Sequence, residues 1–84
     1  MSDLSVKVLA FAGARDALGE SELILALEAP VTARTFLERL CTEHPRLAPY
    51  SGSIRLAVNG AYVGFGDAIS PGDEVAIIPP VAGG

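Results

Sequence analysis

The sequence predicts an α+β domain in which a mixed sheet of about five strands packs against one main helix. Short apolar runs, typical of buried strands, lie on both sides of a single amphipathic segment in the middle of the chain. The dipeptide Asn59-Gly60 separates two of these runs, and Asn-Gly in that setting is typical of a β-hairpin turn. At 84 residues the chain is long enough for one small domain with a modest core.

The N-terminal part predicts a hairpin. Residues 6–11 (VKVLAF) and 22–27 (ELILAL) are short, rich in apolar residues and partly alternating, as strands are. Between them, residues 13–19 (GARDALG) begin and end with glycine and are expected to form a loop or a single helical turn. This short connection favours antiparallel pairing of the two strands. Pro30 ends the second strand.

The middle of the chain predicts the helix. Thr32 is a plausible N-cap, and Pro45 disfavours helical geometry at His44, so the helix should end there. Five residues spaced by three or four positions form one apolar stripe on this helix: Ala33, Phe36, Leu37, Leu40 and Cys41. Residues 45–53 are rich in proline, glycine and serine and are expected to be a loop.

The C-terminal part predicts three further strands. Residues 54–58 and 61–63 form the arms of the Asn59-Gly60 hairpin, and residues 75–78 form the last strand after an irregular connection. The first and last strands are the most continuously apolar, which favours central positions in the sheet. Hairpin, helix, hairpin and strand in this order are the β-grasp, or ubiquitin-like, arrangement. We therefore expect a β-grasp domain over residues 1–78 and an extended tail over residues 79–84.

Composition excludes several classes of function. Ten acidic against six basic residues give a net charge of −4, which argues against nucleic acid as a partner. No apolar run approaches the ~20 residues of a membrane span, and the first five residues lack the basic stretch of a signal peptide. One cysteine cannot form an internal disulfide or a multi-thiolate metal site. We expect a cytoplasmic protein without a metal site or a membrane partner.

The sequence contains no recognisable catalytic constellation. Cys41 and His44 are the only cysteine and histidine, and they are close enough in sequence to suggest a nucleophile and its base. However, Cys41 lies on the apolar stripe, which favours an inert core thiol, and His44 lies where a helix end is expected. We expect no active site within this chain.

The last six residues, Pro79 to Gly84 (PPVAGG), are neither a strand nor a helix. Pro79 and Pro80 should hold the chain extended as it leaves the sheet, and Gly83 and Gly84 can pass through a channel too narrow for side chains. Six extended residues reach roughly 20 Å, enough to enter a partner's active site. The terminal carboxylate is ionised at neutral pH and becomes electrophilic only after another enzyme activates it as a mixed anhydride.

Three segments carry a resemblance to a known family. They are residues 6–19 (VKVLAFAGARDALG), 55–63 (RLAVNGAYV) and 72–84 (GDEVAIIPPVAGG), and the helical region also fits. The sequence resembles the small, sulfur-carrying subunits of molybdopterin synthase. The resemblance covers nearly the whole chain, and the C-terminal segment is its most specific part.

The resemblance implies a role and a set of partners. A ubiquitin-activating-like adenylyltransferase would consume ATP to adenylate Gly84, and a sulfur donor protein would convert it to a thiocarboxylate. The tail, with Pro79, Pro80, Val81, Ala82 and Gly83 leading to Gly84, would then enter the large subunit of the synthase and give its sulfur to the dithiolene of molybdopterin. The implied assembly is a heterotetramer, and this chain would be its non-catalytic sulfur donor and bind no cofactor of its own.

The same resemblance implies a docking patch on the sheet near the tail. Phe11, Tyr62 and Ile78 fall on it by segment matching, and Arg15 is a candidate for its rim. Phe11 and Ile78 could alternatively belong to the ordinary core, and Arg15 could be a solvated loop charge. Ile78 also departs from the aromatic residue often found there in the family.

Three alternatives remain open at this point. The chain could carry sulfur for thiamine or another thio-cofactor, although Pro79-Pro80 and residues 14–19 favour the molybdopterin branch. It could be a ubiquitin-like modifier of target lysines, and having only Lys7 makes self-linked chains less favourable. It could also be a binding module whose tail is incidental.

Overall fold

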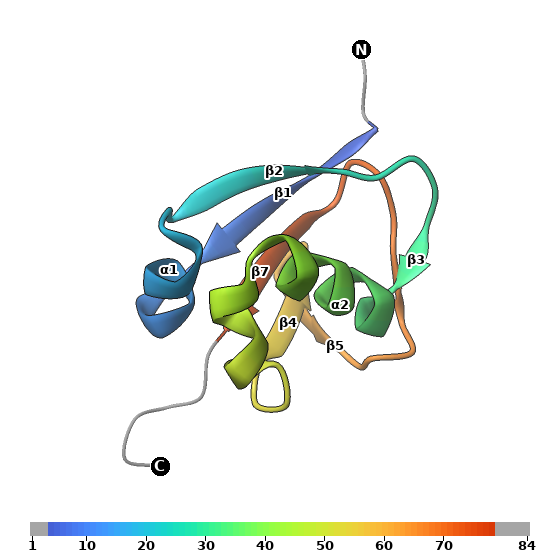
Figure 1. Cartoon of the computed structure of the whole chain (residues 1–84). Helices are drawn as coiled ribbons and strands as arrows, with labels where there is room; N and C mark the ends of the chain where they lie inside the picture. Colours follow the sequence, from blue (N-terminus) through green and yellow to red (C-terminus); the bar gives the residue numbers. More distant parts are fainter. Residues whose placement is uncertain (1–3, 79–84) are drawn as a thin grey trace.

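A five-stranded mixed sheet forms the framework of the domain (Figure 1). The computed structural model describes residues 4–78. Across the sheet the order is β2-β1-β7-β4-β5, where β1 and β7 are parallel and every other neighbouring pair is antiparallel. These strands are Ser5–Ala10 (β1), Glu22–Ala26 (β2), Arg55–Val58 (β4), Ala61–Val63 (β5) and Glu74–Ile78 (β7). The predicted β-grasp fold and the interior positions of the first and last strands are confirmed.

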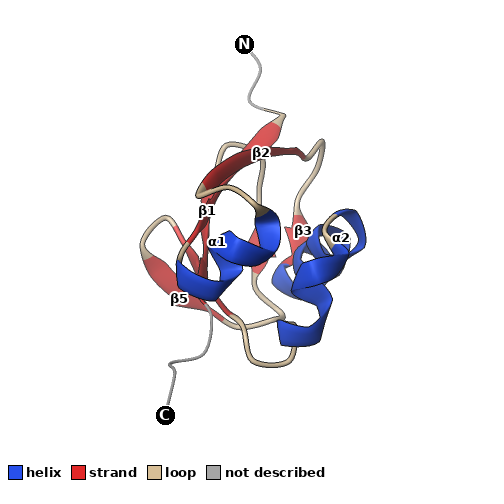
Figure 2. Cartoon of the chain, turned by 60° about the vertical axis from the view of Figure 1, so that its left-hand side comes forward, coloured by secondary structure: helices blue, strands red, loops and turns tan. Residues whose placement is uncertain are grey.

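Helix α2 (Ala33–Glu43) packs over one face of this sheet (Figure 2). Its apolar stripe supplies Phe36 and Leu40, which are fully buried against the inward side chains of the strands. Thr32 caps the N-terminus, as predicted, because its side-chain oxygen accepts a hydrogen bond from the Thr35 N–H at 3.2 Å. The helix ends at His44, whose N–H donates to the carbonyl of Leu40.

The connection between β1 and β2 is a short helix, α1 (Ala12–Leu18), and not merely a loop or single turn. Ala14 and Leu18, four residues apart, lie on one side of α1 and are buried in the core. Gly19 ends the helix with a φ of 82°, the left-handed conformation that glycine adopts without strain. Phe11 precedes the helix in extended conformation, so β1 ends one residue earlier than predicted.

The loop predicted over residues 45–53 is wrong for its first part, which forms a 3₁₀ helix, η1 (Pro45–Tyr50). Proline at the first position of a helical segment loses no hydrogen bond, and its fixed φ suits the turn. Leu47 is fully buried beneath α2 and holds the segment against the core. The Leu47 N–H donates to His44 and the Ser51 N–H to Ala48, which is the three-residue spacing of a 3₁₀ helix.

The predicted hairpin joins β4 to β5. Asn59 and Gly60 have φ angles of 51° and 88°, as a type I′ turn requires. The Asn59 side chain also ties the turn to the start of β7, because its amide donates to Asp73 and its oxygen accepts from the Glu74 N–H, both at 3.0 Å.

A second small sheet was not predicted. It pairs β3 (Val31–Thr32) with β6 (Ala68–Ile69). Strand β6 lies in the connection before the last strand, which was expected to be irregular. Each strand has only two residues, which is too short for a periodicity to be detected in the sequence. Within residues 4–78, no helix is both long and apolar enough to cross a membrane.

Candidate functional site: the open face of the sheet

The two faces of the sheet differ in their surroundings. Side chains alternate along each strand, so Val8, Leu56 and Ile77 point into the core beneath α2 while their neighbours point to the other face. Within the described residues, no helix covers that other face. We call this surface the open face.

An apolar patch occupies the half of the open face at which β7 ends. Strand register places one row of its side chains across four adjacent strands: Leu9 on β1, Ala76 on β7, Ala57 on β4 and Tyr62 on β5. Phe11 and Ile78 follow at the end of the sheet, and they are neighbours because the parallel register pairs Ala10 with Ile77. The open-face patch therefore consists of Leu9, Phe11, Ala57, Tyr62, Ala76 and Ile78.

The structure brings together three of the four predicted contact residues. Phe11 is 52% exposed and Tyr62 is 64% exposed, so neither belongs to the core. Ile78 is partly buried and ends β7 on the same face. Large exposed apolar side chains gathered on one face are typical of a surface that contacts another protein. Their contact with a partner stays a prediction.

Arg15 is placed differently. It lies on α1, after the end of β1, and is not part of the row of strand side chains. It lines a shallow hollow of about 450 Å³ together with Asp16, Glu20 and Arg46. A position beside the patch is consistent with the predicted rim, but the structure does not place Arg15 within the patch.

The predicted tail, Pro79, Pro80, Val81, Ala82, Gly83 and Gly84, lies outside the described residues. Ile78 is the last described residue and directly precedes it. The open-face patch is thus located at the point in the chain where the tail begins.

Ion pairs bound the patch on its other side. Lys7 on β1 lies between Glu22 on β2 and Glu74 on β7, with nitrogen-to-oxygen distances of 3.4 and 3.9 Å. All three side chains are about half exposed, so these pairs add little to stability. They separate the exposed Ile24 on β2 from the apolar residues near the tail.

Sequence reasoning missed Arg55. It is the register partner of Ile78, and its guanidinium carbon lies 5.3 Å from the centre of the Tyr62 ring. The sequence did contain a signal for its position. Successive side chains of a strand point to opposite faces, so in the strand predicted over residues 54–58 Arg55 lies on the face opposite to the buried Ile54 and Leu56.

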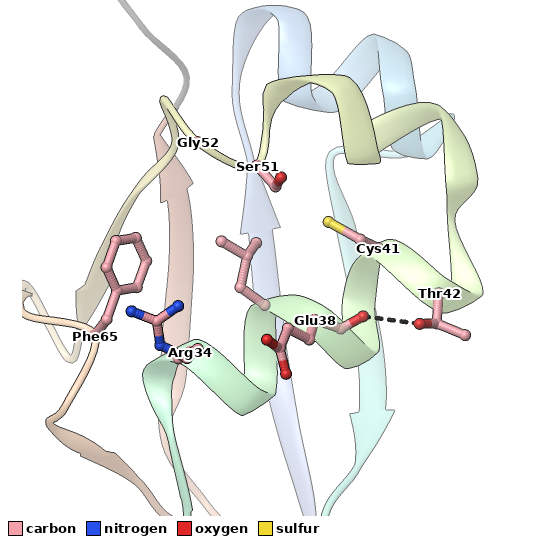
Figure 3. Close-up of a pocket in the computed structure, with 8 residues that line it drawn as sticks. Arg34, Glu38, Cys41, Thr42, Ser51, Gly52 and Phe65 are labelled. Atoms are coloured by element: carbon pink, nitrogen blue, oxygen red, sulfur yellow. Dashed lines mark hydrogen bonds between the residues drawn. The ribbon is translucent and has the colours of Figure 1, made fainter.

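Cys41 and His44 lie on the other side of the molecule, away from the open face. Cys41 is partly buried on α2 and lines a hollow of about 460 Å³ with Arg34 and Phe65, shown in Figure 3, so it is less enclosed than the core thiol that was predicted. Burial raises the pKa of the Cys41 thiol, which disfavours the reactive thiolate. His44 is partly buried, and its backbone N–H closes α2.

Comparisons with known proteins match nearly the whole chain. A family model described as the ThiS family matches residues 8–84. A molybdopterin synthase sulfur carrier subunit from Arabidopsis thaliana is 35% identical over 83 residues, which cover 99% of this chain and 86% of that protein.

Solved structures share the fold. A putative molybdopterin converting factor subunit 1 from Pyrococcus furiosus has a TM-score of 0.80 at 29% identity, over 93% of this chain and 99% of that one. SAMP1 from Haloferax volcanii has a TM-score of 0.79 at 28% identity, over 95% of this chain and 99% of that one. A complex of molybdopterin-converting factor subunits 1 and 2 from Helicobacter pylori contains the same fold, with a TM-score of 0.64 at 21% identity, over 95% of this chain and 99% of that one. The matched family model spans nearly the whole chain, and the protein belongs to the ThiS family.

Proposed function

We propose that this chain is the sulfur carrier of a molybdopterin synthase, with Gly84 as the residue that carries sulfur. The observation that supports the proposal most strongly is the match over nearly the full chain to proteins named molybdopterin synthase sulfur carrier subunit. The sequence PPVAGG after β7 supplies a terminus that can be extended and lacks bulky side chains at its tip.

The proposed chemistry takes place at the Gly84 carboxylate in two steps. The carboxylate oxygen attacks the α-phosphorus of ATP on an activating enzyme, pyrophosphate leaves, and an acyl-adenylate forms. A sulfide equivalent from a sulfur donor protein then attacks the carbonyl carbon, and AMP leaves. The product is a thiocarboxylate, whose sulfur is a better nucleophile than the oxygen it replaces. Other proteins supply the catalytic groups for both steps.

The folded domain would hold this terminus in position. Strand β7 pairs with both β1 and β4, so Ile78, the residue directly before the tail, belongs to a strand held on both sides within the sheet. The open-face patch surrounds that point and would dock on the large synthase subunit while the tail enters its active site. Two carriers on a dimer of large subunits would form a heterotetramer and deliver the two sulfurs of the dithiolene.

A second candidate function has a specific observation in its favour. Structures described as small archaeal modifier protein 1 share this fold at 25–31% identity. A modifier would form the same adenylate but pass its carbonyl carbon to a lysine amine of a target protein. Adducts of higher mass in cell lysate, linked through Gly84, would favour this function over sulfur transfer.

A reconstituted transfer assay tests the proposal. The chain is incubated with activating enzyme, ATP, sulfur donor, large subunit and the pyranopterin precursor, and dithiolene formation is measured. We expect product with the wild-type chain and none after deletion of Gly83 and Gly84. Addition of one alanine after Gly84 is the matched control for the reacting group, because it keeps both glycines but moves the carboxylate. Product formation by the deletion variant would refute the proposal, and a pull-down that retains thiamine-pathway enzymes but no large subunit would favour the other carrier branch.

A further inference from the structure

Arg55 is the charged residue of the open face nearest to the start of the tail. In the antiparallel pair of β4 and β7 it lies directly opposite Ile78, where Cβ atoms are about 4.5–5.5 Å apart. Its guanidinium extends over the Tyr62 ring, at 5.3 Å from guanidinium carbon to ring centre. This cation–π contact orients the guanidinium on the patch without neutralising its charge.

Arg55 differs from two other cations of the domain in its ionic contacts. Lys7 on the same face lies between two glutamates, and Arg39 on α2 pairs with Glu43 at 3.3 Å. Arg55 forms no ion pair with any residue between positions 4 and 78. Residues in contact with it on the open face, Tyr62 and Ile78, offer no carboxylate.

In the proposed function the open-face patch docks on the large subunit. Because the Arg55 guanidinium lies over the Tyr62 ring, a surface that covers Tyr62 also removes water from the guanidinium. Removing water from a charged group is unfavourable unless an opposite charge with good hydrogen-bond geometry replaces it. A carboxylate is the side chain whose two oxygens match the planar guanidinium.

We propose that Arg55 is a specificity-determining residue of the interface, and that the large synthase subunit presents a carboxylate to it beside the entrance of the tail channel. This inference rests on the proposed function and names a feature of the partner that the function does not require. The wild-type complex would then combine apolar burial at Phe11 and Tyr62 with one charge pair at Arg55. The pair would favour the correct partner and reject a surface that is apolar or basic at that point.

Binding of the full-length chain to the large subunit, measured by isothermal titration calorimetry, tests the inference. Arg55→Met keeps the apolar stem over Tyr62 but removes the charge, and we expect the Kd to rise at least about 30-fold because a partner carboxylate would be left unpaired. Arg55→Glu should weaken binding further, and replacement of the facing carboxylate by lysine should partly restore it. The Kd of the wild type should also rise more steeply with salt than that of Arg55→Met.

Arg34 provides the matched control. Its guanidinium also lies over an aromatic ring, at 5.6 Å from the centre of Phe65, but on the side of α2. Arg34→Met and Arg34→Glu should leave the Kd within about twofold of the wild type, whereas an effect as large as that at Arg55 would indicate general charge attraction and overturn the inference.

The outcomes separate the two proposals. Failure of the wild-type chain to bind the large subunit would overturn the proposed function together with this inference. Tight binding by the wild type, by Arg55→Met and by Arg55→Glu alike would overturn the inference alone. Circular dichroism of each variant checks that the fold is intact, which is expected because Arg55 is exposed.

Discussion

Replacement of Phe11 by alanine should weaken docking far more than it weakens the fold. The Phe11 side chain is 52% exposed in the free domain. A buried aromatic side chain covers about 150–250 Å², so an interface that covers the exposed half removes about 80–130 Å² from water. At about 25 cal/mol per Å² this contributes about 2–3 kcal/mol to binding. The expected loss of affinity is therefore about 30- to 150-fold.

Titration calorimetry with the large subunit measures this loss, and thermal unfolding checks the fold. The backbone carbonyl of Phe11 accepts hydrogen bonds from Ala14 and Arg15, and alanine keeps both. Phe65 is the matched control, because it is 41% exposed but lies beside α2. Phe65→Ala should leave the Kd unchanged. If Phe11→Ala binds as tightly as the wild type, or if both variants lose affinity equally, the assignment of the open-face patch as the docking surface is wrong.

Four further predictions follow from single contacts. Ile78→Lys should weaken binding to the large subunit at least about tenfold with an unchanged circular dichroism spectrum, since an apolar side chain buried by the interface would be lost and a second positive charge would be placed opposite Arg55; co-elution equal to the wild type would contradict this. Thr32→Ala should lower the free energy of unfolding by about 1 kcal/mol in urea denaturation, because the Thr35 N–H loses its side-chain acceptor. Asn59→Ala should cost about 1–3 kcal/mol through the left-handed turn and two lost hydrogen bonds, and Asn59→Gly, which keeps the turn, should cost less; equal losses would show that the backbone conformation is unimportant. Cys41 should react with a thiol reagent at pH 8 more slowly in the folded chain than in urea, because burial raises the pKa of its thiol. The contribution of this raised pKa to the free energy of unfolding is full below the ordinary cysteine pKa and is lost as pH rises through the raised pKa.

Elements with strong local signals could be predicted from the sequence. The apolar stripe from Ala33 to Leu40 corresponds to α2, and the Asn59-Gly60 turn has the positive φ angles that the dipeptide favours. The segments of β1 and β7, the most continuously apolar of the predicted strands, correctly indicated interior strands. In each case local preference and burial in the core favour the same structure.

Elements stabilised mainly by tertiary contacts could not be predicted. Among the described side chains of α1, Ala14 and Leu18 are buried, and a glycine lies in its first turn, so the sequence predicted no more than a loop or a single helical turn. The 3₁₀ helix depends on burial of Leu47 beneath α2, which its proline-rich sequence does not indicate. Strands β3 and β6 pair because the chain brings Val31 next to Ile69, a contact between residues far apart in sequence.

Part of the site could also be predicted. Phe11, Tyr62 and Ile78 were placed by resemblance, and the structure gathers them on one face. Arg55 was overlooked because an isolated arginine in a strand is usually a solvated charge. Its significance depends on the register that pairs it with Ile78, and register between strands is a property of the fold.

The central claim is that Gly84 carries sulfur, and an intact-mass measurement tests it most directly. The chain is incubated with the activating enzyme, ATP and a sulfur donor, and its mass is compared with that of a sample without ATP. Conversion to a thiocarboxylate predicts a mass increase equal to the difference between a sulfur and an oxygen atom, located at Gly84 by fragmentation and absent when Gly83 and Gly84 are deleted. An unchanged mass, with an activating enzyme and donor shown to act on another carrier, would contradict the account.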